Sequence, residues 1–150
     1  MTNVLFLCHG NICRSPMAEF VFKNMAKDYA VHIESKAVSA EEIGNPIYPK
    51  AAATLRRHGI PFSDHRARQI TRADYAAFDY IIVMEEYNLP RLRRIIGEDT
   101  DRKVSRLRDF TATPGDIEDP WYSGNFETVF EQITEGCEAL LEQLKRKGEV

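Results

Sequence analysis

The sequence places a cysteine and an arginine at a spacing that suits the binding and transfer of an anion. Arg14 stands six positions after Cys8, and the segment between them contains Gly10. Such a loop at the start of a helix directs successive backbone N–H groups and the positive end of the helix dipole toward one point. The guanidinium adds a planar pair of donors that matches two phosphate oxygens. Because the same surroundings favour the thiolate of Cys8, we expect phosphoryl transfer through a covalent intermediate on this sulfur.

The context of this loop distinguishes it from a chance match to the same spacing. The loop follows the apolar run Val4–Leu7 and ends at Ser15 and Pro16, a pair typical of the start of a helix. Neither Cys13 nor Cys137 has an arginine six residues further on. The alternative, a buried structural thiol beside a solvated arginine, does not account for this context.

Short apolar runs alternate with amphipathic stretches, which predicts strands that alternate with helices. The expected strands are Val4–Leu7, a segment within Val31–Val38, Tyr80–Met84 and Val104–Leu107. The expected helices run from an N-cap at Ser15 to about Tyr29, from Pro49 to about His58, from the end of the strand Tyr80–Met84 to about Ile96 and from Phe126 to Leu144, with a helical turn beginning at Thr71. This alternation implies a parallel sheet with helices on both faces, in which ligands bind beyond the carboxyl ends of the strands. The loop after Leu7 lies at that position.

Length and composition limit the classes of protein to consider. The chain has 150 residues with 20 Lys and Arg against 23 Asp and Glu, so its net charge of −3 disfavours a general nucleic-acid-binding protein. No apolar run approaches the ~18 residues of a membrane span, and the N-terminus lacks the features of a secretion signal. Three cysteines are too few for a disulfide framework. We therefore expect one cytoplasmic domain over residues 1–150.

Residues 4–19 (V-L-F-L-C-H-G-N-I-C-R-S-P-M-A-E) resemble the signature of the low-molecular-weight protein tyrosine phosphatases. The similarity continues in the right order through residues 42–46 (E-I-G-N-P), 56–61 (R-R-H-G-I-P), 65–71 (H-R-A-R-Q-I-T), 78–81 (F-D-Y-I) and 117–122 (I-E-D-P-W-Y). The resemblance implies a single domain with an α/β fold, a three-layer sandwich whose helices flank a four-stranded parallel sheet. This fold is flavodoxin-like and of the phosphotyrosine phosphatase I type. The resemblance also implies a tyrosine phosphatase without a metal or an organic cofactor.

The resemblance assigns catalytic roles to three residues. Cys8 corresponds to the nucleophile that takes the phosphoryl group, and Arg14 to the residue that binds phosphate and stabilises the transition state. Asp119 corresponds to the general acid that protonates the leaving phenolate and then activates the water that cleaves phosphocysteine. From the residues alone, a carboxyl beside two aromatic side chains suits proton delivery, although an Asp-Pro pair also commonly starts a turn. The phosphate-binding loop consists of His9, Gly10, Asn11, Ile12, Cys13 and Arg14.

Other residues correspond to a hydrogen-bond network that supports the loop, namely Asn11, Ser15, Ser35 and His65. The hydroxyl of Ser15 can donate to the sulfur of Cys8, whereas Ser35 and His65 are equally compatible with structural roles. Cys13 corresponds to a second loop cysteine that closes a reversible disulfide with Cys8 on oxidation. The alternative is a packed thiol without a redox role. Cys137, on the apolar face of the last helix, is expected in the core.

Five residues are expected to form the rim of the substrate pocket: Ile12, Glu41, Glu42, Trp121 and Tyr122. An apolar side chain at Ile12 suits the face of an aromatic ring, and Trp121 and Tyr122 can stack at the mouth of the pocket. Related arginine phosphatases resemble this family but carry threonine at the position of Ile12. These features favour phosphotyrosine and other aryl phosphates over alkyl phosphates and phosphoarginine. The acidic rim at Glu41 and Glu42 predicts that acidic peptides are disfavoured.

The expected partners are phosphotyrosine-containing proteins, with inorganic phosphate or another oxyanion in the loop, and neither nucleic acid nor a membrane. The chain is expected to be a monomer or a weak dimer. Rival functions are a thioredoxin-coupled arsenate reductase, which needs a relay of further cysteines, and a protein arginine phosphatase of the same fold. A non-catalytic phosphate-binding module would not need both a nucleophile and an acid. A zinc site at Cys8, His9 and Cys13 lacks a second pair of ligands at suitable spacing.

Overall fold

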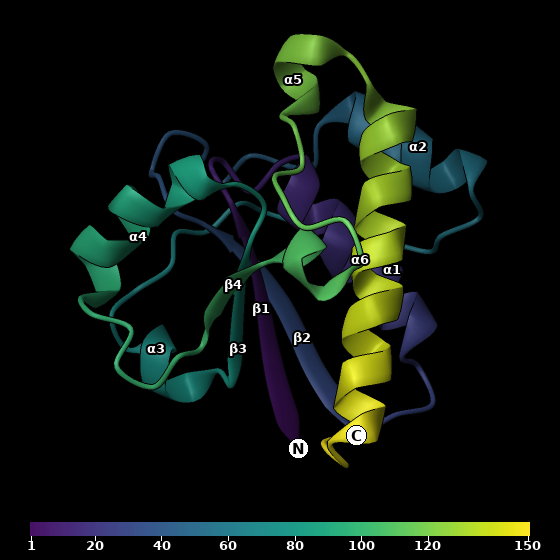
Figure 1. Ribbon diagram of the computed structural model, residues 1–150. Coiled ribbons are helices and arrows are strands. Elements are labelled where there is room, and N and C mark those ends of the chain that lie inside the picture. Colours follow the sequence, from purple (N-terminus) through teal and green to yellow (C-terminus); the bar gives the residue numbers. More distant parts are fainter.

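Four parallel strands form the centre of the computed structural model, which describes all 150 residues (Figure 1). The strands are β1 (Thr2–Cys8), β2 (Val31–Ala37), β3 (Tyr80–Val83) and β4 (Val104–Arg106), and their order in the sheet is β2-β1-β3-β4. β1 pairs with β2 over its whole length, from Thr2 opposite Val31 to Cys8 opposite Ala37. The predicted α/β fold with a four-stranded parallel sheet is confirmed.

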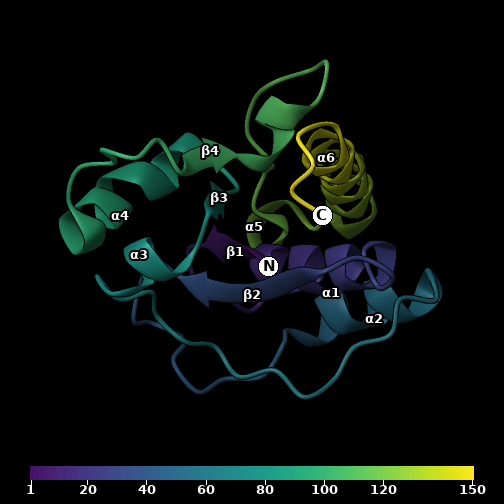
Figure 2. The same ribbon diagram turned by 90° about the horizontal axis from the view of Figure 1, so that it is seen from below.

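Helices cover both faces of this sheet, which gives the predicted three layers (Figure 2). Successive side chains of a strand point to opposite faces, and in β1 both sets are apolar. Val4 and Phe6 pack in a buried cluster with α1 (Arg14–Met25), α2 (Pro49–Arg57) and α6 (Phe126–Arg146). Leu5 and Leu7 pack in a second cluster with α3 (Asp74–Ala77) and α4 (Leu89–Ile96).

Three segments meet at the carboxyl end of the sheet. Because β2 and β3 lie on opposite sides of β1, the strand order reverses there, and the loop after Cys8 occupies this switch point. β3 continues into Met84 and Glu85, and then into the short helix η1 (Glu86–Asn88). The N–H of Ile117 donates to the carbonyl oxygen of Met84 at 2.8 Å, which fixes the segment before α5 (Pro120–Ser123) against β3.

The helix that follows the loop differs at both ends from the prediction. Ser15 was predicted as its N-cap, but α1 already begins at Arg14, and Cys13 occupies the N-cap position without a side-chain hydrogen bond to the helix. The prediction was wrong because the hydroxyl of Ser15 bonds within the loop instead of capping the helix. Pro16 is tolerated in the first turn, where backbone N–H groups have no partner within the helix. α1 ends at Met25, before the predicted Tyr29, because a turn closed by the Tyr29 N–H and the carbonyl oxygen of Ala26 leads into β2.

The last helix, α6, packs its apolar stripe against α1 and the short helix η2 (Leu107–Phe110). Val129, Ile133 and Leu140 are fully buried, and so is Cys137, which confirms its predicted place in the core. Glutamates on the opposite side of the helix are exposed. None of the helices combines the length and the apolar character that a bilayer span requires.

The carboxylate of Asp99 holds the start of β4 in place. Replacing Asp99 should therefore cause a measurable loss of stability. Its carboxylate accepts hydrogen bonds from the Lys103 N–H at 2.8 Å, the Val104 N–H at 3.0 Å and the Tyr75 hydroxyl at 2.6 Å. Burial would raise the pKa of Asp99, but these hydrogen bonds lower it below its usual 3.8. We expect Asp99→Asn to lower the free energy of unfolding by about 1–2 kcal/mol at neutral pH. The measurement is urea denaturation.

The pH dependence distinguishes this explanation from a loss of packing. A carboxylate whose pKa is lowered by folding stabilises the protein above the unfolded value and loses that contribution as the pH falls through the folded value. The difference in the free energy of unfolding between wild type and Asp99→Asn should therefore shrink below pH 3.8. Asp101→Asn, an exposed neighbour, is the matched control and should cost little. An equal loss for both variants, or a loss at Asp99 that does not change with pH, contradicts the assignment.

Candidate active site

The loop between β1 and α1 holds the sulfur of Cys8 at the base of a cavity, with only 3% of the residue exposed. Asn11 adopts a left-handed conformation with φ of 61°, which turns the chain back over the sulfur, and its N–H donates to Cys8 Sγ at 3.3 Å. Gly10, Ile12 and Cys13 line the same cavity, and their backbone N–H groups donate no hydrogen bond within the protein. Free amides around one sulfur form a cradle for an anion.

A chain of hydrogen bonds behind the loop delivers one donor to the sulfur. The amide of Asn11 donates to the hydroxyls of Ser15 and Ser35, at 2.7 and 3.0 Å. The hydroxyl of Ser35 in turn donates a hydrogen bond to Oε1 of Glu19 at 2.6 Å. Because Ser15 Oγ accepts from Asn11, its proton is free for Cys8 Sγ, 3.1 Å away, or for the carbonyl oxygen of Lys36, 3.4 Å away. We assign the proton to the sulfur, which is the nearer of the two acceptors. This direction of donation favours a negatively charged sulfur.

Residues from distant segments hold the loop in place. His65 Nε2 donates to the carbonyl oxygen of Asn11 at 2.9 Å, and the N–H of Arg68 donates to Asn11 Oδ1 at 3.2 Å. Tyr48 donates its N–H to the carbonyl oxygen of Ile12 at 2.8 Å. All four predicted network residues therefore lie together around the loop. A Cβ at position 10 would lie 3.1 Å from Cγ of Glu42, so the Glu42 side chain would have to shift by a few tenths of an ångström to accept a larger residue there.

The guanidinium of Arg14 connects the loop with two other segments at the carboxyl end of the sheet. Its side chain is only 2% exposed, and Nη1 forms a close ion pair with Glu85 and donates to the carbonyl oxygen of Ile117 at 2.9 Å. Nη2 lies 3.5 Å from Oδ2 of Asp119. Burial would lower the pKa of Arg14, but neighbouring negative groups, led by the Cys8 sulfur, raise it above its usual value. Arg14 is therefore a fixed positive charge beside the sulfur.

Asp119 reaches the cavity from the opposite wall. It is the N-cap of α5, and its Oδ1 accepts the N–H of Trp121 at 3.0 Å. Its side chain is 28% exposed, so the carboxyl can exchange protons with solvent and with a ligand in the cavity. The Asp-Pro pair thus starts a helical turn and also directs a carboxyl at the loop.

The rim combines aromatic and acidic side chains. All five predicted rim residues line the cavity. Trp121 packs against the ring of Tyr48 with ring centroids 4.7 Å apart, whereas Tyr122 extends into solvent with 86% of its surface exposed. His9 Nε2 lies 2.8 Å from Oε2 of Glu41, so one rim carboxylate has a partner on the loop itself.

The second loop cysteine also lies on the cavity wall. Cys13 is a free thiol with 5% exposure, and burial together with the charge of Cys8 raises its pKa far above the usual value. Cys13 is therefore protonated at neutral pH. Cys137 is fully buried in α6 and faces the carbonyl oxygen of Ala18 in α1, so it has no access to the cavity.

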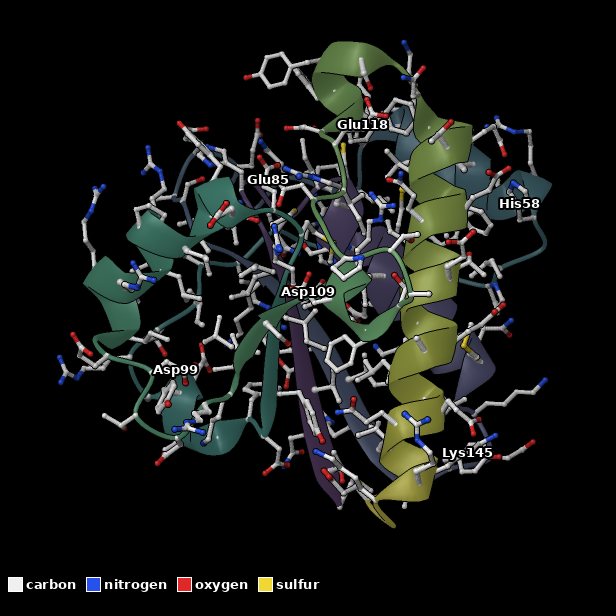
Figure 3. The ribbon with its side chains drawn as sticks, in the orientation of Figure 1. His58, Glu85, Asp99, Asp109, Glu118 and Lys145 are labelled. Atoms are coloured by element: carbon white, nitrogen blue, oxygen red, sulfur yellow. The ribbon has the colours of Figure 1, made fainter.

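Sequence reasoning did not find three residues of the site, Glu85, Glu19 and Tyr48. Glu85 is visible in Figure 3 between α4 and the segment that leads to α5. Its position directly after a predicted buried strand was the one available signal, because such positions lie at the ligand-binding edge of a parallel sheet. Glu19 and Tyr48 carry no comparable signal in the sequence.

Comparison with known proteins gives an independent result. The sequence model of the family described as low molecular weight phosphotyrosine protein phosphatase matches residues 3–150. The protein-tyrosine-phosphatase YfkJ of Bacillus subtilis is 40% identical, and the alignment covers 100% of both chains. The human low molecular weight phosphotyrosine protein phosphatase is 43% identical over 94% of both chains.

Solved structures agree with the sequence comparison. The crystal structure of YfkJ superposes with a TM-score of 0.92 at 39% identity, covering 98% of this chain and 96% of that one. The low molecular weight tyrosine phosphatase SP-PTP of Streptococcus pyogenes gives a TM-score of 0.88 at 38% identity, with 96% and 93% covered. The chain therefore belongs to the low-molecular-weight phosphotyrosine protein phosphatase family.

Proposed function

We propose that this protein hydrolyses phosphotyrosine in proteins, and small aryl phosphates, through a phosphocysteine intermediate on Cys8. The observation that carries the proposal is the set of donors around one sulfur. The Asn11 N–H donates to it and the Ser15 hydroxyl lies 3.1 Å from it. Neighbouring loop residues have backbone N–H groups without a partner in the protein, and a buried arginine lies beside the sulfur. Such a site stabilises a thiolate and an equatorial PO₃ group at the same point.

In the first half of the reaction, Cys8 Sγ attacks phosphorus and the bond from phosphorus to the tyrosyl oxygen breaks. The loop amides and the guanidinium of Arg14 hold the transferring PO₃ group. Asp119, 3.5 Å from Arg14 Nη2 and on the open side of the cavity, donates its proton to the leaving phenolate oxygen. The products are free tyrosine hydroxyl, phosphocysteine and ionised Asp119.

In the second half, the same carboxylate activates water. Asp119 takes a proton from a water molecule, the water oxygen attacks phosphorus, and the S–P bond breaks. Inorganic phosphate leaves, and the thiolate and the protonated Asp119 are restored. The donation from Ser15 makes the sulfur a better leaving group in this step, because it stabilises the negative charge that returns to it. The reaction so written uses no metal and no cofactor.

The rim suits an aromatic phosphate ester. Ile12 and Trp121 supply apolar surface on two walls, and Tyr48 holds the Trp121 ring from behind. A phenyl ring gains from such contacts, whereas a serine side chain is too short to reach them once its phosphate is in the loop. Phosphotyrosine proteins are thus the proposed substrates, and phosphate or another oxyanion is the ligand of the loop.

The two loop cysteines support a second proposal, a reversible disulfide. A peroxide would oxidise Cys8 to sulfenic acid, and Cys13 would then displace water to form the Cys8–Cys13 bond, which a thiol reduces back. Because Cys13 is buried and protonated, it does not compete with Cys8 as a nucleophile toward phosphate. A relay beyond this pair, as arsenate reduction requires, has no candidate because Cys137 is enclosed in α6.

Substrate preference tests the proposal directly. We expect a phosphotyrosine peptide and an aryl phosphate to be hydrolysed in the presence of a metal chelator, because neither step uses a metal. The kcat/KM for phosphotyrosine should exceed that for a matched phosphoserine peptide by about 10²-fold or more, since the serine ester lacks the ring contacts and is the poorer leaving group. Phosphate release is the measurement. Comparable rates on phosphoserine, faster release from phosphoarginine, or loss of activity with chelator would contradict the proposal.

A further inference from the structure

A second cavity opens directly beside the one that holds Cys8. The two share His9, Glu41 and Tyr122 on their common wall, with Arg14 and Asp119 at the base. The second cavity, here called the side pocket, is distinguished by Glu85, Tyr87 and Arg91, which do not line the first. Glu85 follows β3, Tyr87 is in η1 and Arg91 is in α4, so all three come from the segment that continues β3.

One cation of the side pocket, Arg91, has no partner within the protein. The carboxylates of the pocket face cationic or polar partners within the protein. Glu41 bonds to His9, Glu85 forms its ion pair with Arg14, and Asp119 lies near the same guanidinium. Arg91 is half-buried and makes no hydrogen bond or ion pair. A half-buried guanidinium without a partner retains its full capacity for a carboxylate of a ligand.

Two tyrosines line the side pocket together with Arg91, and both leave most of their side chain exposed to solvent. Tyr87 is 69% exposed and Tyr122 is 86% exposed, and neither hydroxyl takes part in a hydrogen bond. They belong to six large apolar or aromatic side chains that the protein leaves open to solvent, and three of these six, Tyr87, Trp121 and Tyr122, line the two cavities. Exposed aromatic side chains around a charged centre are typical of surfaces that bind peptides.

We propose that the side pocket binds an acidic side chain of the substrate that lies next to the phosphotyrosine, with Arg91 as its ion-pair partner and Tyr87 packed against its stem. This inference rests on the proposed phosphatase function and adds a specificity-determining residue to it. Glu42 lines only the first cavity, so that wall repels a carboxylate, whereas Arg91 lines only the side pocket. Acidic residues should therefore be favoured on one side of the phosphotyrosine and not on the other. The repulsion of acidic peptides predicted from Glu42 would apply to one side only, because Glu41 lines both cavities and is paired with His9.

The test uses three phosphotyrosine peptides that differ only next to the phosphorylated residue. One carries glutamates on the N-terminal side, one carries them on the C-terminal side, and one carries alanines on both. Each kcat/KM is divided by the value for a small aryl phosphate with the same enzyme, which reports the chemistry alone. We expect one glutamate peptide to exceed the alanine peptide by about three- to tenfold at low salt, with a smaller preference at high salt.

Variants at position 91 test whether the side chain of Arg91 causes this preference. Arg91→Gln should remove it, Arg91→Lys should retain part of it, and Arg91→Glu should favour a lysine peptide instead. Arg94→Gln is the matched control, because Arg94 lies on the same helix, is exposed and lines neither cavity. The inference is overturned if neither glutamate peptide is preferred, or if the preference survives in Arg91→Gln. Failure of the proposed function itself would be distinct, because the aryl phosphate would then not be hydrolysed.

Discussion

Replacing Cys8 with serine should abolish turnover of phosphotyrosine and aryl phosphates, with a loss of about 10⁴-fold or more in kcat. A serine hydroxyl fits the same position, but it stays protonated at neutral pH and attacks phosphorus poorly. The donors that face the sulfur, the Ser15 hydroxyl and the Asn11 N–H, stabilise a charge that serine does not carry. Steady-state and single-turnover phosphate release are the measurements.

The Cys8→Ser variant should retain the ability of the loop to bind an anion. The amides of the loop and the guanidinium of Arg14 do not depend on the side chain at position 8, so Cys8→Ser should still bind orthovanadate or phosphate. Binding, measured by calorimetry, serves as the control that the loop has folded. Activity within tenfold of wild type would show that the sulfur is not the nucleophile. Loss of both binding and activity would be resolved by Cys8→Ala, which tests the cradle without a hydroxyl.

Replacing Asp119 with alanine should lower kcat for phosphotyrosine by about 10²–10⁴-fold, because the phenolate must then leave without a proton. The loss should shrink as the leaving phenol becomes more acidic, since a stable phenolate needs no proton. A series of aryl phosphates with different phenols is the measurement. A loss of the same size across the whole series would contradict a role in proton donation.

Glu118 offers a matched control for this experiment. It precedes Asp119 in the chain and is exposed, and its carboxylate accepts only a long hydrogen bond, from Asn125 at 3.4 Å. Figure 3 shows Glu118 beside α5. Glu118→Gln removes one negative charge at nearly the same place. A large effect of this substitution would indicate that the local charge, and not proton transfer by Asp119, limits the reaction.

The fold could be predicted from the sequence where burial alone determines the structure. The apolar runs that became β1 and β3 are buried on both faces, so their composition identified them as inner strands. The apolar stripe of α6 likewise placed Cys137 in the core. The start of α1 could not be predicted from capping preferences, because the active-site loop uses the Ser15 hydroxyl for another purpose.

The site could be predicted only where its residues lie in one loop or in a motif. Cys8, Arg14 and Asp119 belong to local patterns, and the structure brings them to one cavity. Glu85 could not be predicted, because its pairing with Arg14 depends on the order of strands in the sheet and joins residues 71 positions apart. Tyr48 is similar, since its contact with Trp121 depends on how α2 is placed beside α5.

The ion pair between the buried Arg14 and the partly exposed Glu85 indicates a site organised before substrate arrives. An arginine with 2% exposure would be costly without a partner, and Glu85 together with the Ile117 carbonyl oxygen supplies that partner. Because Arg14 also approaches Asp119, the phosphate-binding loop and the acid are held in a fixed relation. A preorganised charge stabilises a transition state without reorganisation during the reaction.

The central claim is that the phosphoryl group is bonded to Cys8 during turnover, and it can be observed. With an aryl phosphate whose phenol is acidic, Asp119→Ala should still form the intermediate but hydrolyse it slowly, because water activation requires the carboxylate. Rapid quenching followed by mass spectrometry of peptides should find one phosphoryl group on Cys8, and none in Cys8→Ser. Phosphate release without any modified peptide, or a phosphoryl group on another residue such as His9, would contradict the account.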